Sequence, residues 1–206
     1  MKKNRIAIAI VTLAACARPQ GAPPVPAAHT APILIGETVM IFPVQRGVVP
    51  VADTSARHFT IEQGKLDAEL AYWLPQLGNN VKWVLPEQIQ RAITRSPTLE
   101  IDINNLAVGA FGRAQVKRIG DPLFGDLRKL SAVLNARIAV IPVAAEQIGT
   151  TPQTARVQVA TAVINALSGN VLWFGVIESE AEAQGEEAGM ASAAQAFART
   201  FAPRRN

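Results

Sequence analysis

Two kinds of apolar pattern alternate along residues 33–206, and their order restricts the fold more than any other feature of this sequence. The first is a short continuous run of the length expected for a buried strand, at residues 37–44, 81–85 and 137–145. The second repeats every three or four positions, which predicts a helix with one packed face, at residues 66–77, 86–94 and 121–134. Strands that alternate with helices favour an α/β domain.

The C-terminal third predicts a hairpin followed by a helix. Two apolar runs, residues 155–167 and 171–179, flank Ser168-Gly169-Asn170, which is a strong hairpin signal. Residues 186–201 have helical spacing. We therefore expect a single α/β domain with a mixed sheet packed with helices, parallel early and antiparallel at the C-terminal hairpin. In the helix at residues 121–134, Leu127 and Leu130 should be buried.

Residues 1–15 have the features of a secretory signal peptide. Lys2, Lys3 and Arg5 precede an apolar run at residues 6–14, and a positive segment before a short apolar one is typical of such leaders. The run is far shorter than the roughly 20 residues of a membrane-spanning helix. If the leader is removed, 17 of the 20 basic residues face 16 acidic ones, and the charge falls from +4 to +1. The basic balance therefore gives no reason to expect a nucleic acid partner.

The leader ends at Leu13-Ala14-Ala15-Cys16, which contains the only cysteine of the chain. This tetrapeptide resembles the lipobox of bacterial lipoproteins, in which the cysteine is lipidated, with palmitate among its acyl chains, and becomes the mature N-terminus. An ordinary secretory signal with an incidental cysteine is the alternative. Because Ala17 follows where an aspartate often signals retention in the inner membrane, the resemblance implies an outer-membrane anchor facing the periplasm.

Residues 16–32 then read as the lipidated cysteine and a Pro/Ala-rich tether. Five prolines within residues 17–32 disfavour a helix and favour an extended chain. The expected organisation is a signal peptide at residues 1–15, this tether, and a periplasmic α/β domain at residues 33–206.

The order of elements, together with several short motifs, resembles the periplasmic superfamily that contains the amino-terminal domain of TolB, the penicillin-binding-protein activator LpoB and the curli secretion lipoprotein CsgG. The motifs are Phe42-Pro43, Trp83-Val84-Leu85-Pro86, Gly120-Asp121-Pro122-Leu123 and the Ser168–Trp173 turn. The resemblance implies a non-enzymatic domain that acts as a scaffold or activator, with an envelope protein or peptidoglycan as partner, and it allows an oligomer. The alternative that it implies is a subunit of a CsgG-like outer-membrane secretion assembly.

No catalytic, metal or cofactor motif stands out. The two histidines are His29, in the tether, and His58, in a polar stretch, and no metalloprotease, nucleophile-elbow or Walker-type pattern is present. Asp121 fits a helix N-cap, and Asp67 with Glu69 fits the solvated face of a helix. We therefore expect no enzyme activity, no metal and no cofactor.

Residues 99–119 alternate apolar and polar side chains in two arms, which predicts an amphipathic hairpin. Each arm has about six alternating residues, whereas a membrane strand needs roughly 9–11. We therefore interpret the segment as a hairpin or strand pair that extends the sheet, not as part of a pore, and expect the domain to fold without residues 105–112.

A candidate binding surface is only weakly marked. Basic side chains near the helix predicted at residues 121–134 could form a patch that binds peptidoglycan carboxylates or an acidic partner. The alternative is that they are ordinary solvated surface charges. Trp173, near the hairpin tip, belongs either to an interface or to the core. The candidate residues are Arg113, Lys117, Arg118, Arg128, Lys129 and Trp173.

Overall fold

The computed structural model describes residues 30–48, 57–112, 116–149, 151, 155–180 and 185–203. The predicted signal peptide, Cys16, most of the predicted tether and Arg113 lie outside these residues. The strands are β1 (Thr38–Ile41), β2 (Arg57–Phe59), β3 (Lys82–Val84), β4 (Ile138–Gly149), β5 (Arg156–Asn165) and β6 (Val171–Glu178). The helices are α1 (Gln63–Leu77), α2 (Pro86–Arg95), α3 (Leu123–Leu134), α4 (Glu186–Phe201) and the short 3-10 helix η1 (Gly109–Gly112).

The strands form one mixed sheet, as the sequence predicts. Its order is β3-β1-β4-β5-β6, with β2 paired to the far end of β4. β1 pairs parallel with both β3 and β4, whereas β4, β5 and β6 pair antiparallel. The β5–β6 turn falls at Ser168-Gly169-Asn170, and Gly169 has a φ of 74°, a left-handed conformation that glycine adopts without strain.

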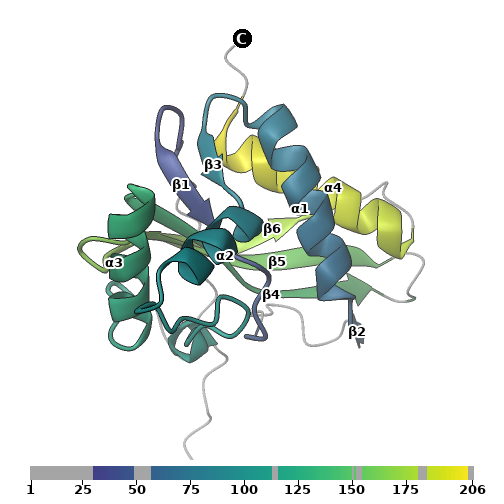
Figure 1. Cartoon of the computed structure of the whole chain (residues 1–206). Helices are drawn as coiled ribbons and strands as arrows, with labels where there is room; N and C mark the ends of the chain where they lie inside the picture. The colour runs from purple at the N-terminus through teal and green to yellow at the C-terminus, as the bar shows by residue number, and fades with distance from the viewer. Residues whose placement is uncertain are drawn as a thin grey trace, which may run out of the picture.

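Helices cover both faces of the sheet (Figure 1). On one face, α1 packs against α4, and Leu66, Leu70, Phe197 and Phe201 contribute to a shared core. On the other face, α2 and α3 bury a second core that includes Leu127 and Leu130. Both leucines are 0% exposed, which confirms their predicted burial. Among the described residues, no helix is both long and apolar enough to cross a bilayer.

The helix predicted at residues 121–134 has its N-cap one residue later than expected. Asp121 was expected to be its N-cap, but α3 starts at Leu123 with Pro122 at the N-cap position. The Asp121 carboxylate nevertheless accepts a hydrogen bond from the backbone N–H of Gly125 at 3.0 Å. The carboxylate therefore still satisfies an amide in the first turn, where a helix has no backbone acceptor to offer.

The described parts of residues 99–119 do not form the predicted amphipathic hairpin. The described residues 99–112 form turns and η1, and the pairing in residues 116–119 is an isolated antiparallel bridge from Arg118 to Asn170. The alternation instead places five apolar side chains in the core beside α2 and α3. These are Ile101, Ile103, Leu106, Val108 and Phe111. A deletion of residues 105–112 would remove three of these core side chains, so the structure gives no support to the expectation that the domain folds without them.

Candidate functional site

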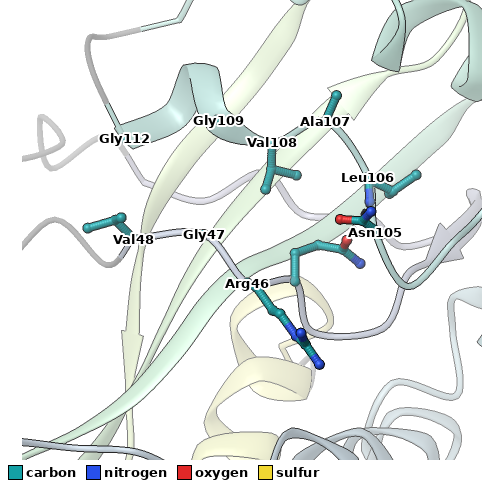
Figure 2. Close-up of a pocket in the computed structure, with 10 residues that line it drawn as sticks. Arg46, Gly47, Val48, Asn105, Leu106, Ala107, Val108, Gly109 and Gly112 are labelled. Carbon is teal, nitrogen blue, oxygen red and sulfur yellow. Dashed lines mark hydrogen bonds between the residues drawn. The ribbon is translucent and has the colours of Figure 1, made fainter.

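A groove lies beyond the C-terminal end of β1, between residues 45–48 and the segment 105–112 (Figure 2). Its volume is about 460 Å³. The lining residues are Gln45, Arg46, Gly47, Val48, Asn105, Leu106, Ala107, Val108, Gly109 and Gly112. The groove was not predicted, because its two walls are about sixty residues apart in the sequence and carry no shared motif.

Gln45 holds the two walls together. Its side chain is 1% exposed, and its amide nitrogen donates to the carbonyl oxygens of Pro43 at 2.6 Å and Ile103 at 2.9 Å. Its amide oxygen accepts the backbone N–H of Leu106 at 2.8 Å. A buried amide with donor and acceptor both occupied can fix a loop that has no regular secondary structure. Gln45 therefore positions residues 103–106 against the end of β1.

Gly47 allows the first wall to lie directly on β4. Its backbone N–H donates to the carbonyl oxygen of Val143 at 2.8 Å, and a Cβ atom at this position would approach that same oxygen to 2.5 Å. Any other residue would therefore push the wall away from the sheet. The glycine thus keeps this wall of the groove against β4.

On the α1 side of the same wall, Asp67 holds the end of β1. Its carboxylate accepts the backbone N–H of Val44 at 2.8 Å, and partial burial raises the pKa of Asp67 to about 6 even though this hydrogen bond acts to lower it. The prediction that Asp67 and Glu69 form a solvated helix face is wrong. Both are half-buried, and Glu69 accepts the indole N–H of Trp73 at 3.0 Å.

The groove offers binding contacts of a mixed kind. Leu106 and Val108 are 6% and 7% exposed and form an apolar backing to the groove, whereas the apolar Val48 is 67% exposed. Asn105 and Arg46 are exposed polar side chains. Figure 2 shows that the Arg46 guanidinium points away from η1, whereas Val108 points toward the backbone near Gly47. None of the lining residues is a histidine, serine, cysteine or carboxylate. The lining therefore suits the non-covalent binding of a segment with apolar and amide groups.

The predicted basic residues are distributed over two neighbouring elements. Lys117 and Arg118 are exposed beside the β5–β6 turn, where the Lys117 carbonyl accepts the N–H of Val171 at 2.9 Å. Arg128 and Lys129 are exposed on α3. The two elements meet where the Phe124 ring of α3 lies against Gly169 in the turn. Among these four described residues, no side-chain hydrogen bond or ion pair links one element to the other.

Trp173 does not belong to this patch. It is half-buried on the opposite face of the sheet, where its ring meets Phe201 of α4 in a T-shaped contact with centroids 5.7 Å apart. The indole also crosses Gly175, at which a Cβ atom would lie 2.3 Å from the ring. Trp173 therefore packs against α4 and is not a member of the predicted basic patch.

His58 lies on β2, a strand that the sequence did not predict. Its Nδ1 lies 2.9 Å from a carboxylate oxygen of Glu146 on β4, which makes a cross-strand pair at the exposed end of the sheet. Within the described ranges, no three His, Cys, Asp or Glu side chains are grouped so that they could hold a metal ion.

Comparisons with known proteins give distant structural likenesses. No protein-family model and no curated protein sequence matches this chain. It is similar to a PelC dodecamer structure from Paraburkholderia phytofirmans, with 13% identity over 85% of this chain and 96% of that chain and a TM-score of 0.41. It is also similar to lipoprotein GNA1162 from Neisseria meningitidis, with 8% identity over 69% of this chain and 78% of that chain and a TM-score of 0.35. Similarity at this level does not transfer a function, and the resemblance to the TolB, LpoB and CsgG superfamily stays a prediction.

Proposed function

We propose that this protein is a lipid-anchored component of the bacterial cell envelope whose α/β domain is a non-catalytic accessory or scaffold module. The observation that carries this proposal is Leu13-Ala14-Ala15-Cys16, which follows a positive, apolar leader and precedes a proline-rich segment. A lipidated cysteine in this position would tether the domain to the outer membrane, on its periplasmic side. More than one acyl chain is needed for stable anchoring, which lipidation of this type supplies.

The groove beyond β1 is the surface through which we propose that the module binds its partner, either an envelope protein or peptidoglycan. Its walls are fixed by Gln45 and Gly47, so a ligand would meet a preformed site and lose little affinity to ordering the protein. The exposed Val48 and Asn105 would contact that ligand directly.

Two experiments test the two parts of this proposal. For the anchor, Cys16→Ser should move the protein from the membrane fraction to the soluble periplasmic fraction, whereas the neighbouring Ala17→Ser should leave it in membranes. For the groove, a photo-crosslinking amino acid at Val48 should give a discrete protein or peptidoglycan adduct in intact cells. The same amino acid at Val133, which is 48% exposed on α3, is the matched control. Equal adducts at both positions, or none at Val48, would count against the groove.

A further inference from the structure

The outer edge of β6 is open along most of its length. β6 is the last strand in the sheet order and spans eight residues, Val171–Glu178. Residues 117–119 cover only its beginning, through the Arg118–Asn170 bridge and the hydrogen bond from Val171 to Lys117. In the part of the chain that the structure describes, no other strand pairs with this edge.

The ladder with β5 fixes which backbone groups point outward. Ser179 donates its N–H to the carbonyl of Val157 at 2.8 Å, so this residue faces β5. In an antiparallel pair the direction alternates along the strand, so Gly175 and Ile177 also face inward. The N–H and C=O groups of Phe174, Val176 and Glu178 therefore point away from the sheet.

This edge has few of the features that keep edge strands apart. Monomeric proteins protect such strands with lysines, prolines, bulges or a covering segment. β6 has a bulge near Leu172 and the short cover at its start, but no lysine, arginine or proline occurs along Val171–Glu178. Phe174 and Val176 are half-buried, and Leu172 is 47% exposed. The open part of β6 is therefore a template for an added strand.

We propose that β6 pairs antiparallel with β6 of a second copy of this chain, about a two-fold axis at Gly175, to form one continuous sheet through two domains. In this register Phe174 lies opposite Val176 of the second copy, and Trp173 lies opposite Ile177. Both are apolar cross-strand pairs, and the axis brings two glycines together where side chains would otherwise be closest. An isologous contact of this kind closes on itself.

The charges at the two ends of the edge favour a second copy as the occupant. Lys117 and Arg118 are exposed at the beginning of β6, and Glu178 and Glu180 are exposed at its end. Antiparallel pairing places the basic end of each copy beside the acidic end of the other. Within one copy, a carboxylate oxygen of Glu178 lies 3.9 Å from a guanidinium nitrogen of Arg156, and one of Glu180 lies 2.9 Å from a guanidinium nitrogen of Arg199. Ion pairs with the second copy would share these carboxylates. They would fix direction and register more than they add affinity.

The pairing is independent of the lipid anchor, so it can be tested in the full chain carrying Cys16→Ser. The expected result in light scattering is a dimer whose dissociation constant rises about tenfold or more in Val176→Pro. This change removes one outward N–H from each copy and leaves the hydrogen bonds to β5 intact. The control is Val133→Ala on the exposed side of α3, away from β6, which should dimerise as the parent does. Proline is not used at this control position because it would break the helix. Circular dichroism verifies that each variant is folded.

Disulfide trapping tests the register and remains informative even if the proline variant misfolds. A mixture of Phe174→Cys chains and Val176→Cys chains should give mixed disulfide dimers, because hydrogen-bonded antiparallel partners have Cα atoms about 5.5 Å apart. A mixture of Phe174→Cys and Glu178→Cys chains, one register away, should give few. A monomer, an oligomer without the Phe174–Val176 disulfide, or equal trapping in both mixtures would overturn the proposal.

Discussion

Replacement of Gln45 by methionine tests whether one buried side chain positions the groove. Methionine matches the length and much of the volume of glutamine but makes none of its three hydrogen bonds. The N–H of Leu106 would lose its acceptor, and the carbonyls of Pro43 and Ile103 would each lose a donor. Since Gln45 is 1% exposed, water cannot replace these partners without opening the structure.

The size of the effect follows from those three groups. A buried polar group left without a partner costs about 1–3 kcal/mol, and partial relaxation lowers the sum for neighbouring groups. We expect Gln45→Met to reduce the free energy of unfolding by about 3 kcal/mol. The matched control is Gln90→Met on the exposed side of α2, which should change it by less than about 0.5 kcal/mol.

Urea denaturation measures the loss of stability, and hydrogen exchange shows where the structure opens. In Gln45→Met, the amides of residues 103–112 should exchange faster relative to the other amides of the domain. The amides of α4 should show no such relative increase. If the two glutamine variants have the same midpoint, or if exchange rises equally everywhere, Gln45 does not position the groove.

Three further changes test the packing of the core, the raised pKa of Asp67 and the groove wall at Gly47. Leu127→Ala should cost about 3–4 kcal/mol because Leu127 is fully buried, whereas Val133→Ala on the exposed side of α3 should cost little, and equal melting temperatures would contradict this packing. Asp67→Asn should leave stability unchanged below pH 4 and raise it above pH 6, by up to about 2 kcal/mol after allowance for partial exposure. The sign follows because the folded state holds the proton more tightly, so the parent protein loses stability as the pH rises through about 6; parallel pH profiles would contradict it. Gly47→Ala should weaken crosslinking through Val48, because the added Cβ displaces the groove wall from Val143. Unchanged crosslinking in a folded variant would show that partner binding does not need this close contact.

The elements that the sequence predicted well are those whose patterns are local. The helical repeat at residues 186–201 has the same bounds as α4, and the turn at Ser168-Gly169-Asn170 is where β5 reverses into β6. Burial of Leu127 and Leu130 follows from spacing along a single helix. In each case the apolar period or the turn residues lie within one short stretch of chain.

The features that could not be predicted depend on contacts between distant segments. Gln45 bonds to residues that lie 58 and 61 positions away, and nothing near it in the sequence marks a buried amide. In residues 99–112 the alternation of apolar and polar side chains resembles that of a strand, because every second or third side chain lies in the core. Turns in this segment prevent it from pairing with another strand. The three residues of β2 are too few and too polar to give a strand signal, and they pair only because β4 extends beside them.

The mass of the mature N-terminal peptide tests the central claim most directly. The protein is purified from membranes of cells that express the full chain, digested, and its first peptide is identified by mass spectrometry. We predict that this peptide begins at Cys16 and carries a diacylglyceryl group and an N-linked acyl chain, both of which are absent when Cys16 is replaced by serine. A mature chain that begins elsewhere, or an unmodified thiol at Cys16, would contradict the account of a lipid-anchored envelope protein.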